Sequence, residues 1–401
     1  MKFIISSALL KKAMNRVSPL IATNAIMPIL ENVLMEVVAG ESILRLRTTD
    51  LNATMTTSVP IDDMSAQTST GRPFMVCCPA ALLKETLAVL PEQPLIFEMN
   101  PETNRIEIKT DNGVFRLMGE GVSFFPKDIV KGRYSALEPG VGGMLKMSPS
   151  QLKAIQTKVC PFASTDATLA VLTGVYTEFS SSGTSFVATN RSALVKLVDA
   201  TLSFSSVHQA INIPARAFKL ALNLFTDSEE TVVVSWGSTQ VVFANKESTL
   251  SIQLIGENGS QFPPYHPLLT ESKQASLCLN RAGLLATLRR IKFFSDSSSY
   301  VAVSLHPKQP QLIVLDAVNP LDPERGAVEN LIGEYEGRET IQLGFGVKSL
   351  TELLGAVDYP RIKIGLSAPN KSVLIYEETT GTGVEELSYC QLLMPVMLPK
   401  G

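Results

Sequence analysis

The stretch Val-Phe-Arg-Leu-Met-Gly-Glu-Gly-Val-Ser-Phe-Phe-Pro, residues 114–126, has a counterpart in Ser-Ile-Gln-Leu-Ile-Gly-Glu-Asn-Gly-Ser-Gln-Phe-Pro, residues 251–263. Each stretch begins as a strand-like run of alternating apolar residues, passes through glycine and ends in Phe-Pro. The two Phe-Pro pairs start at Phe125 and Phe262, which are 137 residues apart. Self-similarity at such a spacing indicates a duplicated structural unit.

Other segments show a similar spacing. Thr49-Asp50-Leu51-Asn52 and Thr189-Asn190-Arg191-Ser192 each follow a predicted strand, and they are 140 residues apart. Proline-initiated helices are predicted from Pro79 and from Pro214, and a third helix, predicted over residues 346–357, lies 132 residues beyond Pro214. One third of the 401 residues is about 134, so three copies fill the chain.

Each copy is predicted to contain a first helix, then strands and a turn, then a second helix and further strands. Ser148 is a predicted helix N-cap because Pro149 follows it at the first helical position, and Asn280 is a second predicted cap. Strands and helices do not alternate regularly, which favours an α+β fold with antiparallel sheets over a doubly wound parallel sheet. We predict three domains, over residues 1–127, 128–270 (with a linker at about 128–144) and 271–401.

Composition excludes several classes of protein. No stretch reaches the roughly 18 apolar residues of a membrane span, and the first residues do not form a signal peptide. The five cysteines form no Cys-x-x-Cys pair and suit a reducing compartment, which predicts a cytoplasmic protein. The three histidines lie far apart and no nucleotide-binding, hydrolase or zinc-protease motif is present, so we expect no catalysis, cofactor or metal. The net charge of −3, taken alone, argues against a nucleic-acid partner.

The charges are distributed unevenly along the chain, however. The predicted helices contain 13 of the 35 Lys and Arg residues but only 2 of the 38 Asp and Glu residues. Solvated helix faces usually mix both signs, although an ordinary solvated face remains the alternative explanation. The helices are predicted over residues 7–18, 79–90, 148–160, 214–226, 280–295 and 346–357.

This imbalance favours helices that face a polyanion. No aromatic residues interleave with the basic ones and no base-reading motif is present, so the pattern predicts sequence-independent contact with the phosphates of duplex DNA. The basic residues predicted at this face are Lys11, Lys12, Arg16, Lys84, Lys153, Lys158, Arg216, Lys219, Arg281, Arg289, Arg290, Lys292 and Lys348.

The carboxylates provide few candidates for a catalytic or metal-binding site. Asp50 and Asp316 form a candidate catalytic pair, but both are predicted to lie in equivalent turns, where Asp is common. Asp62 and Asp63 are candidate metal ligands, although a solvated loop accounts for them better.

Several short motifs together carry a family resemblance. They are Met1-Lys2-Phe3, Met27-Pro28-Ile29-Leu30, Thr49-Asp50-Leu51, the two Phe-Pro ends and Met394-Pro395-Val396-Met397. In this combination the chain resembles, over its whole length, the bacterial sliding clamps, which are the beta subunits of DNA polymerase III. The resemblance implies a head-to-tail homodimer that forms a closed ring of six similar domains. Its helices would line a hole around duplex DNA, and its role would be non-catalytic: to keep a polymerase on its template.

The resemblance also implies a hydrophobic pocket between the second and third domains. Such pockets receive short extended peptides from the replicative polymerase, the clamp loader, translesion polymerases and repair proteins. By motif, the pocket would comprise Leu172, Thr189, Leu194, Pro263, Leu268, Ser372, Leu392, Met394, Pro395 and Val396.

Two further sets of residues follow from the resemblance. Asn24 occupies a position in a DNA-contacting loop where the family often has Arg. At the ring interface, Phe115 and Leu117, as alternate outward residues of an edge strand, would meet Phe293 and Phe294 of a second copy.

The chain departs from the family pattern in four further places. Asn190-Arg191-Ser192-Ala193 stands where Asp-Gly-His-Arg is frequent, so the pocket rim and its peptide preference are altered. Leu169-Ala170-Val171 replaces a more polar, aromatic stretch that can touch DNA, and Met397 stands where Arg is common. The tail, ending in residues 399–401, is slightly longer than usual. Two other classes of protein are alternatives to this interpretation. One is an enzyme with an active site between repeats, around Asp50 and Asn190, and the other is a scaffold whose helices face an acidic protein.

Overall fold

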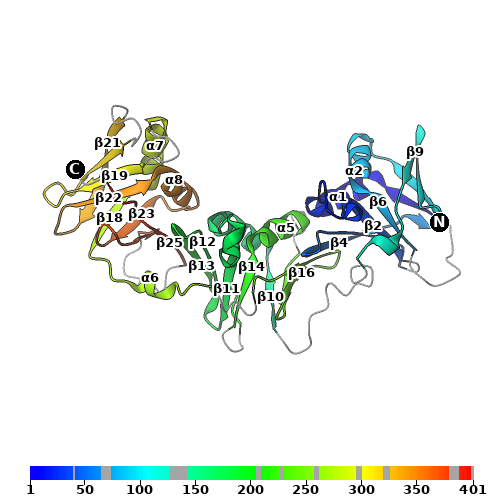
Figure 1. The fold of residues 1–401 in the computed structure, drawn as a ribbon, viewed down its shortest axis with the longest axis horizontal. Helices are drawn as coiled ribbons and strands as arrows, with labels where there is room; N and C mark the ends of the chain where they lie inside the picture. Colours follow the sequence, from blue (N-terminus) through cyan, green and yellow to red (C-terminus); the bar gives the residue numbers. More distant parts are fainter. Residues whose placement is uncertain are drawn as a thin grey trace. The chain divides into compact units, whose positions relative to one another are not determined.

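The computed structural model describes residues 1–38, 41–64, 74–100, 102–126, 142–204, 209–225, 230–256, 262–294, 300–318, 326–378 and 388–398. Within these residues the order strand, helix, three strands occurs twice in each of three successive repeats (Figure 1). Every strand pairing is antiparallel, which confirms the predicted α+β class. The predicted linker and the two boundaries at residues 127 and 128 lie outside the described residues, and the division into three domains stays a prediction.

The first repeat comprises β1 (Lys2–Ser6), α1 (Ser7–Val17), β2 (Asn32–Val38), β3 (Ile43–Thr49), β4 (Ala53–Pro60), β6 (Phe74–Pro79), α2 (Ala80–Val89), β7 (Pro94–Asn100), β8 (Arg105–Thr110) and β9 (Gly113–Met118), with a short β5 (Asp63–Met64) after β4.

The second repeat comprises β10 (Gly143–Met147), α4 (Pro149–Lys158), β11 (Gly174–Ser180), β12 (Gly183–Thr189), β13 (Ala193–Asp199), β14 (Gln209–Pro214), α5 (Ala215–Phe225), β15 (Val232–Trp236), β16 (Gln240–Ala244) and β17 (Ser248–Gln253).

The third repeat follows a short helix, α6 (His266–Thr270), and comprises β18 (Ala275–Asn280), α7 (Arg281–Ile291), β19 (Tyr300–Leu305), β20 (Leu312–Val318), β21 (Gly326–Glu336), β22 (Ile341–Gly346), α8 (Val347–Gly355), β23 (Arg361–Leu366), β24 (Val373–Glu377) and β25 (Tyr389–Leu393).

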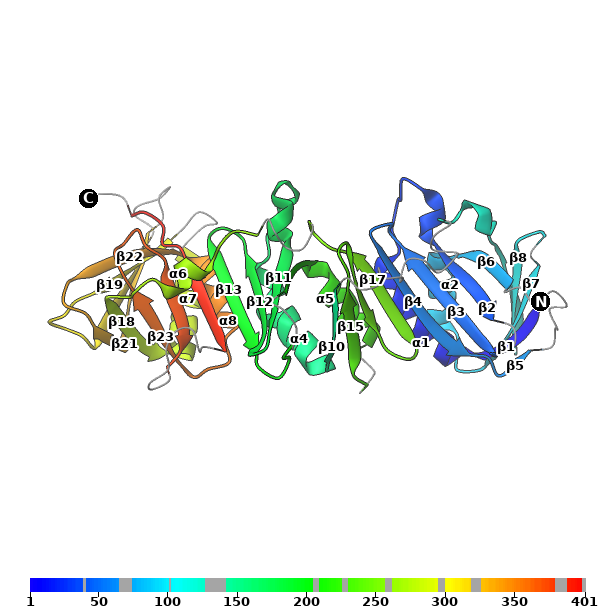
Figure 2. The same ribbon diagram turned by 90° about the horizontal axis from the view of Figure 1, so that it is seen from below.

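The described chain divides into two compact units, residues 1–153 with 216–257, and residues 154–215 with 258–401. The first unit contains a five-stranded sheet, β5-β1-β7-β8-β9, and an eight-stranded sheet, β10-β15-β16-β17-β4-β3-β2-β6. The second contains a twelve-stranded sheet, β14-β11-β12-β13-β25-β24-β23-β18-β21-β20-β19-β22. Figure 2 shows β2, β3 and β4 side by side in one unit and β11, β12 and β13 side by side in the other.

The units follow from how the repeats are joined. The last strand of the second repeat, β17, pairs with β4 of the first repeat, and the last strand of the third repeat, β25, pairs with β13 of the second. Strands of the second repeat therefore belong to both units. Each junction extends one repeat's sheet into the next, so it satisfies edge strands that would otherwise be open.

All six predicted helices are present within one to four residues of the predicted ends. The start of α4 is a capping box, because the Gln151 amide donates to Ser148 Oγ (3.2 Å) and the Ser148 amide donates to Gln151 Oε1 (2.8 Å). Asn280 caps α7 by accepting a bond of 2.9 Å from the Gly283 amide. The predicted caps at both positions are confirmed.

The helices pack by one apolar face. In α1, Leu10, Met14 and Val17 are fully buried, and α1 lies beside α2 (Figure 1). The spacing of these residues puts them on one side of the helix, and the basic residues of α1 lie on the other. The helix ends at Val17 because Ser18-Pro19 follows, and proline cannot donate the next backbone hydrogen bond.

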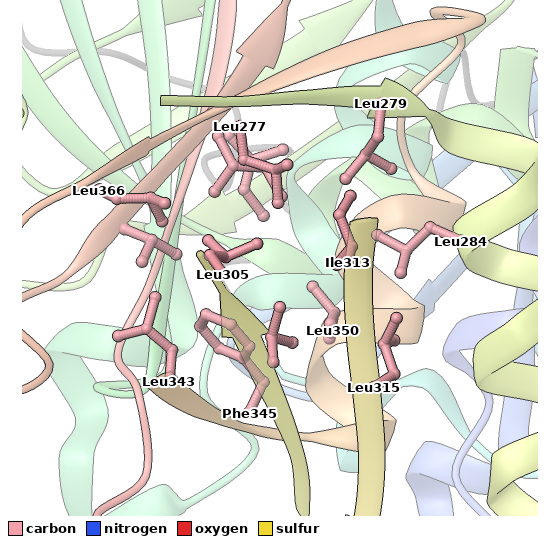
Figure 3. Close-up of a pocket in the computed structure, with 14 residues that line it drawn as sticks. Leu277, Leu279, Leu284, Leu305, Ile313, Leu315, Leu343, Phe345, Leu350 and Leu366 are labelled. Atoms are coloured by element: carbon pink, nitrogen blue, oxygen red, sulfur yellow. The ribbon is translucent and has the colours of Figure 1, made fainter. Parts of the chain in front are cut away.

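The third repeat has an apolar core between its strands and helices. Leucine and phenylalanine side chains from β18, β20, β22 and α8 converge there (Figure 3), around a cavity of about 20 Å³. Every lining residue is apolar, and a water or ligand at this depth would find no hydrogen-bonding partner. We therefore read this cavity as a packing void of the core and not as a binding site.

The structure corrects one residue-level prediction about the strands. Asp316 does not lie in a turn equivalent to that of Asp50, because it is inside β20, opposite Ala302 and Val328.

Among the described residues, no helix combines the length and apolarity that crossing a membrane requires.

Candidate functional site

The junction of β13 and β25 forms a continuous apolar row in the second unit. Leu194 lies opposite Leu392, Leu392 lies opposite Leu374 of β24, and Thr189 of β12 lies opposite Leu194. Residues directly opposite one another in an antiparallel pair share a face of the sheet. One row of four side chains therefore crosses four strands, at the boundary between the second and third repeats.

Three leucines of this row belong to a buried cluster. Tyr265 and Leu269, from the segment that joins the second repeat to the third, pack with Leu194, Leu374 and Leu392. All five are at most 6% exposed. Covering a sheet face in this way removes apolar surface from water, so the α6 segment is fixed on the face that carries the row.

An apolar rim remains exposed beside the cluster. The side chains of Leu268, Met394 and Val396 are 47%, 44% and 39% exposed. The tail is fixed by its backbone, because the Met394 amide donates to the Ser192 carbonyl and the Val396 amide donates to the Gly344 carbonyl, both at 2.8 Å. Adjacent apolar side chains that stay exposed on a fixed backbone are typical of a binding surface.

The predicted pocket residues fall into two groups. The structure buries Leu172, Thr189, Leu194, Ser372 and Leu392, whereas Pro263, Leu268, Met394 and Val396 are exposed and Pro395 is half-buried. Strand pairing brings Thr189, Leu194 and Leu392 together, and Phe262, the neighbour of Pro263, packs on the buried cluster. Leu172 is the last but one residue of a 3-10 segment, Ala167–Thr173, that packs on β11 and β12.

Ser372 has a distinctive property among these residues. It is only 5% exposed, and its Oγ atom makes no hydrogen bond to any described residue. Its carbonyl accepts a bond of 2.9 Å from Lys273 Nζ. A buried hydroxyl without a partner costs free energy.

A hydrogen-bonded aromatic group fixes the connector between the repeats. The Tyr265 hydroxyl donates to Glu178 of β11, and the rings of Tyr176 and Phe262 stack with centroids 4.5 Å apart. His266 stacks on Tyr265, and its Nε2 atom lies 3.4 Å from Glu178 Oε1. Burial, reinforced by the bond to Glu178, raises the pKa of Tyr265 far above its usual value, so the hydroxyl stays a donor. Sequence reasoning missed Tyr265 and Glu178.

The altered rim is an Asx turn. Asn190 Oδ1 accepts bonds from the Ser192 and Ala193 amides at 3.2 and 2.9 Å, and Arg191 has φ of 78°. Asp50 makes the equivalent turn, accepting from the Asn52 and Ala53 amides at 3.0 and 2.7 Å. Both side chains therefore form backbone turns, as predicted for Asp50.

The basic helix faces form a second candidate surface. Lys12, Lys84, Lys153, Arg216, Lys219, Arg289, Arg290, Lys292 and Lys348 are exposed, and Lys11, Arg16, Lys158 and Arg281 are half-buried. In the first unit a surface hollow is lined by Lys11, Lys12, Asn15 and Arg16 of α1 and by Asn223 of α5. Asn24 is exposed in the loop after α1, with φ of 59°.

Several of these cations contact backbone or hydroxyl groups at helix ends. Arg281 donates from Nε to the Tyr359 carbonyl (3.0 Å) and from Nη1 to the Leu354 carbonyl (3.1 Å). Lys11 Nζ donates to the Ala88 carbonyl (2.9 Å). Cations are favoured near helix C-termini, so Arg281 and Lys11 stabilise α8 and α2 respectively.

Other cations pair with acids that sequence reasoning did not assign to the helix faces. Arg216 lies 2.5 Å from Asp50 and Lys158 lies 2.5 Å from Asp358. Arg16 pairs with Glu247 at 3.1 Å, and Arg290 pairs with Glu329. The charge imbalance of the helices is therefore offset locally by four carboxylates from other segments.

The residues predicted at the ring interface differ in exposure. Phe115 of β9 is 39% exposed, and Phe293 and Phe294 after α7 are 78% and 44% exposed. Leu117 is only 5% exposed, so the prediction that it points outward is wrong. It lies opposite Ile106 and is covered by its own chain.

Metal ligation receives no support from the geometry. In the part of the chain that the structure describes, no three His, Cys, Asp or Glu side chains form a group able to hold a metal ion. All five cysteines are free thiols, and burial raises the pKa of Cys77 and Cys78 to about 12. These thiols are therefore protonated and suited to packing.

Comparisons with known proteins agree over the whole chain. The family model of the DNA polymerase III beta subunit, N-terminal domain, matches residues 1–127, and that of its central domain matches residues 146–263. The chain is 25% identical to the beta sliding clamp of Synechococcus elongatus over 405 residues, covering 99% of this chain and 100% of the relative. It is 26% identical to the beta sliding clamp of Synechocystis over 420 residues, with the same coverage.

Solved structures show the same fold. The DNA polymerase III subunit beta of Pseudomonas aeruginosa superimposes with a TM-score of 0.84 at 21% identity, covering 99% of this chain and 100% of that chain. A structure of the sliding clamp from that organism bound to griselimycin superimposes with a TM-score of 0.83 at 22% identity and the same coverage.

Proposed function

The chain belongs to the DNA polymerase III beta subunit family, and we propose that it acts as a DNA sliding clamp. In this role, two copies close into a ring around duplex DNA and carry bound replication and repair proteins along it. The ring has no reaction of its own to catalyse, because topology alone keeps the bound polymerase on its template. We place this activity in the cytoplasm, where the five free thiols suit the reducing conditions.

The observation that carries this proposal is the rule by which repeats are joined. At each internal junction, the last strand of one repeat pairs with the third strand after the first helix of its neighbour, as β17 does with β4 and β25 with β13. In the described chain, β9 of the first repeat pairs only with β8, so its other edge is free. Residues 326–332 of β21 in the third repeat pair only with β20, because β18 pairs with residues 333–336, so this part of β21 also has a free edge. A second copy supplies both partners, and the result is a head-to-tail interface.

The two strands have complementary properties. β9 is an edge strand with the exposed Phe115 opposite Ile108, and Phe293 and Phe294 lie after α7, which packs beside β21. Arg116 of β9 is 74% exposed, whereas the part of β21 with a free edge contains Glu329. Opposite charge on the two edges favours the pairing of different strands over self-pairing.

The helix faces are proposed to contact DNA. Six helices with few acids of their own supply cations that contact phosphates without reading bases. Such contacts are screened by salt and exchange easily, which permits sliding.

The junction of β13 and β25 is proposed to be the peptide pocket. Its exposed rim of Leu268, Met394 and Val396 suits an extended peptide with alternating apolar residues. The polymerase catalytic subunit, the clamp loader, translesion polymerases and repair proteins would share this site. Methionine at the rim suits a surface that accepts several partners.

Two measurements test this proposal. Sedimentation equilibrium at micromolar concentration is expected to give twice the 43.4 kDa mass of the chain. Charge reversal at Lys12, Lys153 and Arg289, which are exposed on three helices, is expected to weaken binding of a short duplex at least tenfold while the melting temperature stays within a few degrees. A monomer, or unchanged DNA binding, would contradict the proposal.

The two alternative classes have less support. Asp50 and Asn190, the residues proposed for an inter-repeat active site, are engaged in backbone turns, and Asp50 also pairs with Arg216. A scaffold facing an acidic protein would not need the free strand edges of β9 and β21 that ring closure uses.

A further inference from the structure

Two carboxylates outside the helices form ion pairs with basic residues of the helix faces that are proposed to contact DNA. Glu247, in the turn between β16 and β17, lies 3.1 Å from Nη1 of Arg16 in the first unit. Asp358, in the connection from α8 to β23, lies 2.5 Å from Nζ of Lys158 in the second. The same arrangement is therefore present in both compact units.

In each ion pair, the acidic side chain is more exposed than the basic one. The side chains of Arg16 and Lys158 are 13% and 25% exposed, whereas those of Glu247 and Asp358 are 61% and 73% exposed. Lys158 also lies over the Tyr389 ring, with Nζ 5.7 Å from its centroid. A phosphate that approaches these points therefore meets the carboxylate before it meets the cation.

We propose that Glu247 and Asp358 weaken the binding of DNA, because they pair with Arg16 and Lys158 and repel the phosphates. This inference rests on the proposed function, because it assumes that the helix faces contact DNA. Its physical effect is to keep sequence-independent binding weak, so that retention depends on ring closure and the ring moves freely.

Salt dependence gives this effect a measurable form. Each phosphate that a protein neutralises on duplex DNA contributes about −0.9 to the slope of log K against log salt concentration. Converting Glu247→Gln or Asp358→Asn removes the competing charge and keeps the size of the side chain. Each variant should therefore steepen the slope by up to about 0.9, and the double variant by up to about 1.8, if Arg16 and Lys158 each gain a phosphate.

The other two ion pairs are less suitable for the test. Asp50 Oδ1 also accepts hydrogen bonds from the Asn52 and Ala53 amides, so its substitution would disturb a turn. Glu329 lies in β21, which is the proposed ring edge. Glu247 and Asp358 are therefore the two acids whose charge can be removed with the least disturbance of the backbone and of the proposed interface.

The experiment measures binding of a fluorescein-labelled 20-base-pair duplex by anisotropy over a series of sodium chloride concentrations. The matched control is Glu98→Gln, which removes a carboxylate that pairs with Lys109 at 2.7 Å in the five-stranded sheet. We expect the double variant to bind roughly three- to tenfold more tightly at low salt, with a steeper slope, and the control to match the unmodified protein. Melting temperatures are recorded for all three proteins.

Two outcomes would overturn the inference. The first is a double variant whose slope of log K against log salt concentration is unchanged. The second is a control that gains as much affinity as the double variant, because the change in net charge alone would then explain the gain. Failure of the proposed function gives a different result, because charge reversal at Lys12 and Arg289 would then leave duplex binding unchanged. The two failures are therefore distinguishable in one set of titrations.

Discussion

The Tyr265 hydroxyl donates a hydrogen bond to the Glu178 carboxylate, and this bond ties the connector between the second and third repeats to β11. Tyr265 is 2% exposed, and its carbonyl accepts a bond of 3.0 Å from the Leu268 amide. The connector also carries Pro263, so two exposed residues of the proposed pocket depend on this anchor. The rigidity of the pocket wall is thus set by a residue pair outside the pocket itself.

The first prediction concerns this anchor. Tyr265→Phe keeps the ring and removes the donor, which leaves the largely buried Glu178 with one bond fewer and costs about 1–3 kcal/mol. We expect affinity for a labelled peptide with Leu or Phe at alternate positions to fall about fivefold to twentyfold in anisotropy titrations. Glu178→Gln keeps an acceptor and should lose less.

The matched control is Tyr335→Phe. The Tyr335 hydroxyl donates to the Glu339 carbonyl at 2.7 Å, away from the β13–β25 junction. Tyr335→Phe should therefore lower the melting temperature without changing ligand affinity. Equal losses of affinity in the two variants would contradict a positioning role for Tyr265.

The second prediction concerns the exposed rim. Replacing Leu268 and Met394 by Ser removes apolar surface that a peptide would cover, and each side chain is about half exposed in the free protein. With about 25 cal/mol per Å² of apolar area, each change should cost binding about 1 kcal/mol, or about fivefold in affinity. Met144→Ser, which changes a side chain 60% exposed on β10, should leave peptide affinity unchanged, and a comparable loss there would contradict the pocket assignment.

The third prediction concerns the ring interface. Phe115→Arg places a charge at an apolar contact on β9, so the protein should sediment as a monomer at concentrations where the unmodified chain is dimeric. Phe124→Arg is the control, since Phe124 is 69% exposed but lies in the 3-10 segment Val122–Phe124 and not on an edge strand. Dimers of Phe115→Arg as stable as those of the control would argue against β9 as the interface strand.

The fourth prediction concerns acid stability. A hydrogen bond from Arg361 lowers the pKa of Glu378 below its ordinary value of 4.5. Because the folded-state pKa is the lower one, this pair stabilises the fold above pH 4.5, and the contribution is lost as the pH falls through the folded-state pKa. Glu378→Gln should therefore lower stability slightly at pH 7, by less than about 1 kcal/mol because the pair is exposed, and should flatten the loss below pH 4.5.

Urea unfolding at a series of pH values between 3 and 7 measures this contribution. The comparison protein is Glu102→Gln, which changes an exposed carboxylate in the same background. If the difference between Glu378→Gln and the unmodified chain did not shrink in acid, the assignment of this pair would be wrong.

Most of the fold could be predicted because its determinants are local. The Phe-Pro ends at Phe125 and Phe262 marked the repeat, and apolar spacing and caps located all six helices, since these signals depend on residues within a few positions of each other.

Contacts between distant segments could not be predicted in this way. Glu247 and Arg16 are 231 residues apart, and only the pairing of β17 with β4 brings them together. Leu117 was expected to point outward, because alternation along a strand distinguishes two faces but does not say which one its own chain covers. Tyr265 and Glu178 were missed for the same reason, since their bond joins a loop to a strand 87 residues away.

The most direct test of the sliding-clamp account is retention on DNA of different topology. The protein is loaded on a nicked circular plasmid by a clamp loader, and the DNA is then either kept circular or cut once before gel filtration. We predict that the ring stays on the circle and is lost from the linear form by sliding off its ends. Equal loss from both forms would contradict topological tethering.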